Sequence, residues 1–207
     1  MTTKTRGLTA TLEERLKMLS AHRRGHSERV AAVMESLAQR HRLDPDAARL
    51  AGIAHDLARE MSRPDLLAEA ARLGIVWGPE EEHEPLLLHG PIAARWLQEA
   101  HLGTPSIWNA IHYHTTAAPG LDSLGRALFI ADGVEPGRRF EARAMLYDLS
   151  HQDLDAGYCA VIEHTLAYLR ERGLAPHPDM LEALRECPSG RSVPPEMREE
   201  TPPRTRH

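Results

Sequence analysis

Aromatic residues are scarce in this chain. Phe, Trp and Tyr together make up 4% of its 207 residues, whereas β-sandwiches concentrate aromatic and β-branched side chains. Ala, Leu, Arg and Glu, which favour helices, are abundant instead. The composition therefore predicts an all-α fold, and the length predicts one main domain with a sizeable core.

Cysteines and long apolar segments are also few. Cys159 and Cys187 are too few to predict a disulfide framework, and neither lies in a CxxC or metal-ligand spacing. Their scarcity fits a reducing, cytoplasmic setting. The amino terminus has no apolar segment of the signal-peptide kind, and no run approaches the roughly 18 apolar residues that span a membrane. We therefore expect a soluble cytoplasmic protein with no membrane partner.

The chain has no excess of positive charge. Its 25 Lys and Arg residues face 30 Asp and Glu residues, which gives a formal net charge of −5. Proteins that bind nucleic acids generally need a basic surface to displace counterions from phosphates. We thus expect no nucleic-acid partner, and an anionic ligand would have to be attracted by metal ions and local arginines.

Apolar residues at helical spacing, together with capping signals, divide the chain into helices. The expected helices cover residues 12–19, 26–38, 44–56, 62–74, 89–97, 104–114, 122–132, 154–172 and 179–185, with a loop over 77–85. Residues 188–207 are rich in Pro, Arg and Glu and are expected to be disordered. The predicted organisation is an amino-terminal helical extension (1–20), a main domain (21–175), a carboxyl-terminal helical extension (176–187) and the tail (188–207).

His55 and Asp56 are neighbours on an otherwise apolar helical segment. Burying an imidazole and a carboxylate there requires a partner for each, and a divalent metal satisfies both. A surface pair at a helix end is the alternative for an isolated dipeptide. Further candidate ligands favour the metal, because each stands on a different predicted helix or helix junction beside apolar residues that would turn it inward. These are His26, His89, His114 and Asp132.

The candidate ligands lie in five segments that carry a specific resemblance. The segments are His26-Ser27-Glu28-Arg29-Val30-Ala31, Ala51-Gly52-Ile53-Ala54-His55-Asp56-Leu57-Ala58-Arg59, Leu87-Leu88-His89-Gly90, Ala110-Ile111-His112-Tyr113-His114-Thr115-Thr116 and Ile130-Ala131-Asp132-Gly133-Val134-Glu135-Pro136-Gly137-Arg138. Together they resemble the HD-domain superfamily of metal-dependent phosphohydrolases, and within it the YqeK-like branch of symmetrical bis(5'-nucleosyl)-tetraphosphatases. The resemblance covers about residues 20 to 170. Two positions depart from the branch: Ala117 replaces its usual glycine, and Arg59 replaces a common lysine.

This resemblance implies a helical bundle with two metal ions in its core, over the HD domain at residues 21–175. It places His26, His55, Asp56 and Asp132 on one ion, with Asp56 bridging to a second ion that His89 and His114 complete. Iron is the usual metal of the branch, and manganese or another divalent ion is a substitute. The imidazole and carboxylate ligands by themselves fit iron, manganese or zinc without choosing among them. Two such ions roughly 3.5–4 Å apart clamp the attacking and leaving oxygens and acidify a water.

Four further residues are candidates for binding phosphate, and each has a structural alternative. Arg59 lies four residues after His55, so on a continuing helix it would share its face and contact a phosphate or orient the leaving group; we name it with Asp56 as catalytic. Its alternative is a solvated helix end. Thr115 and Thr116 could donate hydroxyl groups or cap their helix, and Arg138 could bind phosphate or form a surface salt bridge. The tryptophans are expected in the core, and the remaining histidines, including His164 and His177, have no supporting context.

The activity that this resemblance implies is hydrolysis of diadenosine tetraphosphate, or related dinucleoside polyphosphates, to two ADP by metal-activated hydroxide. One alternative is another HD-family phosphohydrolase, such as a nucleotidase or an alarmone phosphodiesterase. A second is a catalytically silent signalling module, although the presence of all six ligands argues against it. A third is that the histidines are structural and hold no metal. The expected partner is a small nucleotide, and relatives of the branch suggest a homodimer.

Overall fold

The computed structural model of the chain describes residues 12–188. These residues form helices and no strand, so the all-α prediction is confirmed. Residues 12–18 are helical. The expected disordered tail, apart from Pro188, lies outside the described residues. The later elements are α2 (Ala21–His41), α3 (Pro45–Ala54), α4 (Arg63–Arg72), α5 (Pro79–His83), the 3-10 helix η1 (Pro85–Leu88), α6 (His89–Glu99), α7 (Pro105–Tyr113), α8 (Ser123–Val134), α9 (Arg143–Gln152), α10 (Leu154–Glu171) and α11 (Pro178–Arg185).

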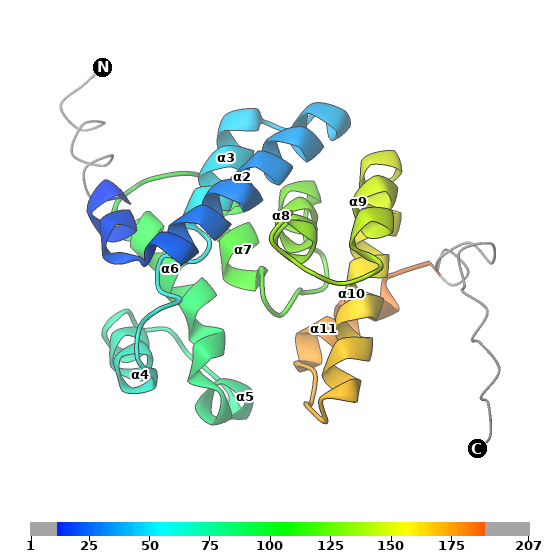
Figure 1. Ribbon diagram of the computed structural model, residues 1–207. Helices are drawn as coiled ribbons and strands as arrows, with labels where there is room; N and C mark the ends of the chain where they lie inside the picture. The colour runs from blue at the N-terminus through cyan, green and yellow to red at the C-terminus, as the bar shows by residue number, and fades with distance from the viewer. Residues whose placement is uncertain (1–11, 189–207) are drawn as a thin grey trace.

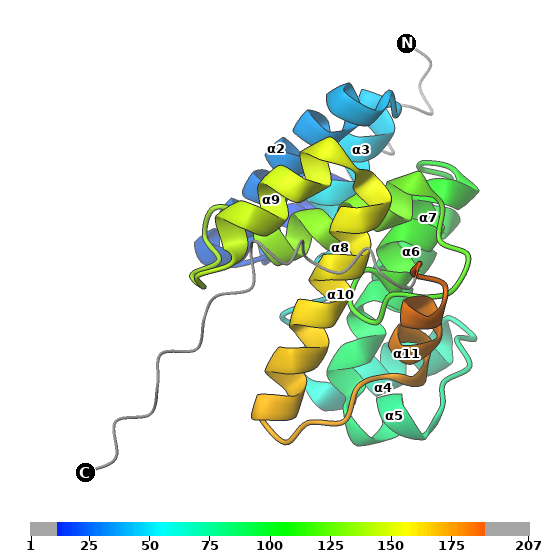
Figure 2. The ribbon, with the colours of Figure 1, turned by 90° about the vertical axis from the view of Figure 1, so that its right-hand side faces the viewer.

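Helix α8 forms the centre of the bundle and packs against α2, α7 and α10 (Figure 1). Figure 2 shows α10 running across α8, with α9 folded back beside it. Most of α8 is fully buried because its sequence is apolar on almost every side, as in Leu128 and Ile130. Asp132 is carried in the last turn of this helix, so the core helix itself delivers a carboxylate to the interior.

Several helices begin where local capping chemistry predicts. The side chain of Asp44 accepts hydrogen bonds from the backbone amides of Asp46 and Ala47 and starts α3. Thr104 caps α7 and Asp122 caps α8 in the same manner. Each cap satisfies amide groups that the first helical turn leaves unpaired. The three starts are confirmed because the signal for each lies within a few consecutive residues.

The close packing of α2 on α3 depends on a glycine. A Cβ atom on Gly52 would lie 2.6 Å from the Cα of Ala31 and 2.9 Å from its amide nitrogen. Both of these atoms are backbone, so the two helices could not remain at this distance with any larger residue. Gly52 therefore allows α2 to bring His26 close to the end of α3, where His55 and Asp56 lie.

Two expectations about the elements are wrong, and one helix was not expected. Helix α3 ends at Ala54 and residues 55–60 form turns, so Arg59 does not lie on a helix continuing from His55. The expected loop over 77–85 contains α5 and the start of η1. Helix α9 was not predicted, because it buries only Leu146 and Ser150 and therefore carries no apolar stripe at helical spacing.

The two cysteines are paired, although their number and spacing predict no disulfide framework. Cys159 of α10 and Cys187, which follows α11, form a disulfide with a Cα–Cα distance of 5.8 Å. The two residues are 28 positions apart, and only the return of α11 toward α10 brings them together. Spacing along the chain carries no signal for such a pair. None of the described helices is long and apolar enough to cross a membrane.

Candidate metal centre

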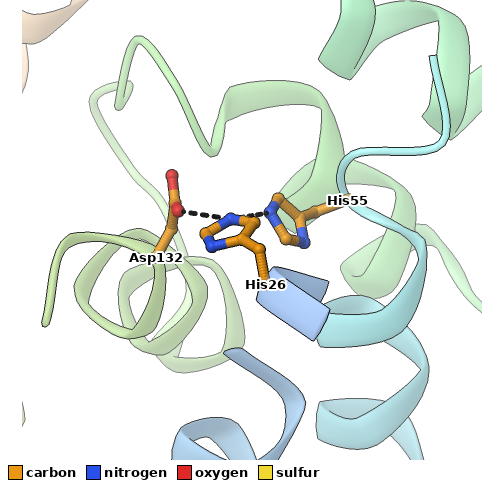
Figure 3. A group of neighbouring side chains, drawn as sticks. All are labelled: His26, His55 and Asp132. Atoms are coloured by element: carbon orange, nitrogen blue, oxygen red, sulfur yellow. Dashed lines mark hydrogen bonds and ion pairs between the residues drawn. The ribbon is translucent and has the colours of Figure 1, made fainter. Parts of the chain in front are cut away.

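Six histidine and aspartate side chains meet where five helical elements converge. The helices supply them mostly from their ends: His26 from α2, His55 and Asp56 after α3, His89 at the start of α6, His114 at the end of α7, and Asp132 from the last turn of α8. Figure 3 shows His26, His55 and Asp132 pointing toward one another. All are buried except Asp132, whose side chain is 22% exposed. The structure thus brings together all six residues that the sequence marked as ligands.

One half of the cluster surrounds Oδ2 of Asp56. The Nε2 atom of His26 lies 3.0 Å from Oδ1 of Asp132 and 3.3 Å from Nε2 of His55. The Oδ2 atom of Asp56 lies 3.5 Å from Nε2 of His26 and 3.4 Å from Nε2 of His55. Two imidazoles and two carboxylates therefore present four ligand atoms to one small volume.

The other half surrounds Oδ1 of the same aspartate. The Nε2 atoms of His89 and His114 are 3.0 Å apart. Oδ1 of Asp56 lies 3.2 Å from Nε2 of His89 and 3.8 Å from Nε2 of His114. Each oxygen of Asp56 thus faces its own pair of imidazoles, which is the arrangement that a bridging carboxylate requires.

Backbone carbonyls orient three of the imidazoles. Nδ1 of His55 donates to the carbonyl of Gly52 at 2.8 Å, and Nδ1 of His114 donates to that of Ile111 at 2.7 Å. His89 bonds the carbonyl of Leu86 in the same way. Each acceptor lies three residues earlier, at the end of a helix, where carbonyl groups lack helical partners. These histidines stand at helix ends because their rings cap those ends.

This orientation makes the cluster fit a cation. With the proton on Nδ1, each Nε2 presents a lone pair to the centre. The Nε2 atoms of His89 and His114 would then repel each other at 3.0 Å, as two acceptors do when no positive charge separates them. Neutral imidazoles and carboxylates held in this way are the ligands that divalent transition metals prefer. The donor set therefore fits divalent metal ions.

The charge states of the cluster suit metal binding. Burial alone would raise the pKa of Asp56, but the surrounding histidines hold it well below its usual range. Burial also opposes ionisation of Asp132, yet His26 and Arg138 lower its pKa further than burial raises it. Burial lowers the pKa of His114 to about 4, so its ring is neutral at pH 7. Asp56, Asp132 and His114 are thus ionised or neutral as metal ligands need to be. Burial opposes the charge of His55, but Asp56 and Asp132 raise its pKa overall, so a metal ion would compete with a proton for this ring.

Glu135 contacts Nδ1 of His26, the ring nitrogen that does not face the cluster. Its role was not predicted from the sequence. Its Oε1 lies 3.2 Å from Nδ1 of His26, while Nε of Arg29 donates to its Oε2 at 2.5 Å. The backbone amide of Gly137 also donates to Oε2. Burial opposes the charge of this carboxylate, but the bonds from Arg29, Gly137 and His26 lower its pKa overall. Two signals were available in the sequence: Glu135 lies three residues after Asp132, and it belongs to one of the segments that carry the resemblance.

Three arginines line a cavity of about 300 Å³ that opens onto the cluster: Arg23, Arg59 and Arg138. Arg23 donates to Oδ2 of Asp56 at 2.6 Å, and Arg138 donates to Oδ1 of Asp132 at 2.5 Å. The Nε atom of Arg23 is buried and has no hydrogen-bond partner within residues 12–188. Arg23 was not predicted, although it lies one helical turn before His26 and hence on the same face.

The two threonines differ in their relation to this cavity. Thr115 lines it, and its Oγ1 lies 3.2 Å from Nε2 of His114 and 3.4 Å from Nε2 of His89. Thr116 is buried and does not line it. Ala117 follows with a φ of 54°, the left-handed region that favours glycine. The departure at Ala117 therefore replaces a glycine where the backbone conformation suits one.

The geometry agrees with a known family. The HD-domain model matches residues 23–137, which include all six clustered residues. The chain therefore belongs to the HD-domain family. A structure from Clostridium acetobutylicum, described as a predicted HD superfamily hydrolase involved in NAD metabolism, superimposes with a TM-score of 0.81 at 26% identity and covers 86% of this chain and 95% of its own.

Relatives within this family carry a particular name. The symmetrical bis(5'-nucleosyl)-tetraphosphatase of Bacillus subtilis is 30% identical over 79% of this chain and 88% of its own length. The protein of the same name from Halalkalibacterium halodurans is 26% identical over 79% of this chain and 87% of its own length. The resemblance to the HD superfamily and to this branch, drawn from the motifs, is confirmed.

Proposed function

We propose that the chain is a metal-dependent hydrolase that cleaves diadenosine tetraphosphate symmetrically to two ADP. The observation that carries this proposal is Asp56, whose two carboxylate oxygens each face a separate pair of buried imidazoles. Such a centre suits hydrolysis of phosphoanhydrides. The choice of substrate rests on the relatives, which are named symmetrical bis(5'-nucleosyl)-tetraphosphatases and match about four fifths of the chain.

Two ions would divide the ligands between them. His26, His55, Asp132 and Oδ2 of Asp56 would hold one ion, and His89, His114 and Oδ1 of Asp56 would hold the other. We propose iron as the native metal, with manganese or another divalent ion as a substitute. When bound, the ions supply positive charge at the phosphates and lower the pKa of a water toward neutrality.

The chain's own side chains bind and orient the phosphates. Arg23, Arg59 and Arg138 line one cavity beside the cluster, and guanidinium groups recognise phosphate oxygens through paired hydrogen bonds. Thr115 can donate its hydroxyl to the same phosphates from the cluster side. Holding the polyphosphate against the centre removes much of the entropic cost of bringing the reacting atoms together. Of the predicted phosphate ligands, Thr116 has the weakest support.

We extend the proposal to the whole chain. Residues 21–175 would form the catalytic domain, with 1–20 and 176–187 as helical extensions, and the protein would act as a homodimer on a small nucleotide. We place it in the cytoplasm, where disulfides are rare. The Cys159–Cys187 disulfide argues against that placement. Thiol titration of protein freshly taken from cells would test whether the two cysteines are paired there.

Product analysis tests the activity. Purified protein supplied in turn with iron, manganese and cobalt is incubated with diadenosine tetraphosphate, and the nucleotides are separated by chromatography. Two ADP per substrate are expected. AMP plus ATP, or no turnover with any of the three metals, would contradict the proposal. A parallel panel of nucleoside monophosphates and guanosine tetraphosphate separates it from the other HD-family activities.

A further inference from the structure

A second cavity, of about 270 Å³, borders the metal centre on another side. It shares four lining residues with the arginine-lined cavity: His114, Thr115, Asp132 and Arg138. The two cavities therefore meet along one edge of the cluster. A bound molecule that crosses this edge would have one part in each cavity, and its middle would lie beside the candidate metal-binding residues.

The far wall of the second cavity is built from rings. The rings of Phe140 and His164 stack with centroids 4.3 Å apart and an interplanar angle of 22°. Tyr168 lies one helical turn beyond His164 on α10 and also lines the cavity, although 49% of it is exposed. Burial lowers the pKa of His164, so its ring is neutral at pH 7. The cavity thus changes from charged at the cluster edge to aromatic at the far end.

We propose that this second cavity binds one nucleobase of the substrate, stacked against Phe140 and Tyr168. The inference rests on the proposed function, because it assigns the phosphates to the edge at Thr115 and Arg138. Aromatic side chains stack on any base, since every base has a π-face. Ligand cavities are roughly 300–1,000 Å³ for drug-sized molecules, so this one has room for a single nucleoside and leaves the second nucleoside outside.

The test compares two ligands that differ only in the nucleoside. The full-length, metal-loaded protein is titrated with ADP and with pyrophosphate in a calorimeter. We expect Tyr168→Ala and Phe140→Leu each to weaken ADP binding about fivefold or more, because a base-stacking ring is lost. Pyrophosphate binding should not change in either variant. Tyr168→Phe keeps the ring and should bind ADP as the unaltered protein does.

Tyr147→Ala is the matched control, because that ring lines a different cavity with Arg29 and Pro136. Tyr168 is half exposed, and Phe140→Leu keeps an apolar side chain, so both variants should fold. Unchanged ADP affinity in both variants, or equal losses for ADP and pyrophosphate, would overturn the base site. If those results come with normal cleavage of diadenosine tetraphosphate, the proposed function stands without this site. Failure of the unaltered protein to cleave that substrate would instead remove both.

Discussion

At the scale of single residues, the position of a carboxylate between two pairs of imidazoles explains why His55 and Asp56 are adjacent. The turn that follows α3 makes His55 a member of one pair of imidazoles and places Asp56 where its two oxygens face both pairs. The sequence identified all six clustered residues because each stood beside apolar neighbours in a recognisable motif. It did not identify Arg23 and Glu135, because their role depends on contacts with residues far along the chain.

The contact between Glu135 and His26 leads to a prediction. Glu135→Gln keeps the shape of the side chain but removes the charge that faces Nδ1 of His26 and Nε of Arg29. Loss of such a supporting partner typically costs about 10- to 100-fold in metal affinity. Competition with a chelator of known affinity measures this. Glu28→Gln, on the exposed face of the helix that carries His26, should bind metal normally. Equal metal affinity in both variants would show that Glu135 does not support the site.

At the scale of elements, local signals predicted more than distant ones did. The starts of α3, α7 and α8 follow from caps a few residues long. The end of α3 at Ala54 could not be predicted, because Leu57 and Ala58 continue the helical spacing of apolar residues while the backbone turns to present His55 and Asp56. Arg59 nevertheless lines the cavity beside the cluster. The disulfide and α9 were missed because tertiary packing, rather than local pattern, determines both.

The close contact of α2 with α3 predicts that adding a single methyl group at Gly52 destabilises the protein. Gly52→Ala would place a Cβ against the backbone of Ala31 and force the two helices apart. We expect a loss of about 1–3 kcal/mol in the free energy of unfolding, together with weaker metal binding, because His26 and His55 come from these two helices. Urea unfolding and metal titration measure the two effects.

Gly25→Ala is the control for this substitution. Gly25 lies in the same helix α2, and its Cβ would meet only the flexible tip of Arg29 at 3.3 Å. Replacing a mid-helix glycine by alanine there should stabilise the protein by up to about 1 kcal/mol. Equal effects of the two substitutions would contradict the close packing at Gly52.

The contribution of Glu69, on α4, to stability is expected to depend on pH. Glu69 accepts two hydrogen bonds from Arg72 and one from Nε1 of Trp96, and the bond from Arg72 is the main reason that its pKa falls to about 2. Because the folded pKa lies below the usual 4.5, the stabilisation is complete above pH 4.5 and is lost as the pH falls toward 2.

Glu69→Gln tests this dependence. At pH 7 the variant should be less stable than the unaltered protein by roughly 1 kcal/mol, a value discounted for solvent screening at this partly exposed side chain. The difference should narrow as urea unfolding is repeated at pH 5, 4 and 3. Both proteins carry the same metal centre, so its own pH dependence cancels in the difference. A gap that stays constant with pH would contradict the lowered pKa of Glu69.

At the scale of the whole molecule, one covalent link ties the carboxyl-terminal helix to the bundle. The Cys159–Cys187 disulfide closes a loop of 28 residues, and cross-links of this size stabilise proteins by roughly 3 kcal/mol. Dithiothreitol should therefore lower the urea midpoint of the protein. A variant with both cysteines replaced by serine should have the lower urea midpoint already without dithiothreitol, and adding dithiothreitol should not change it. An identical midpoint with and without dithiothreitol would show that the disulfide contributes nothing to stability.

The charge of the whole molecule also bears on function. The net charge of −5 would repel a polyphosphate, yet the cavity at the cluster is lined by Arg23, Arg59 and Arg138. Local arginines, together with the metal ions that the ligands fit, reverse the sign of the charge where the substrate would bind. The net charge predicted that local arginines would have to attract an anionic ligand, and Arg23, Arg59 and Arg138 are the arginines placed to do so.

The central claim is that one carboxylate joins two metal ions in the core. Elemental analysis of the protein purified without chelators, beside the Asp56→Ala variant, tests it most directly. We predict about two divalent ions per chain in the unaltered protein, and loss of most of this metal together with all hydrolysis in Asp56→Ala. The exposed Asp148→Ala variant should keep both. Protein that takes up no metal even when iron, manganese and cobalt are supplied, or an active and fully metallated Asp56→Ala variant, would contradict the account.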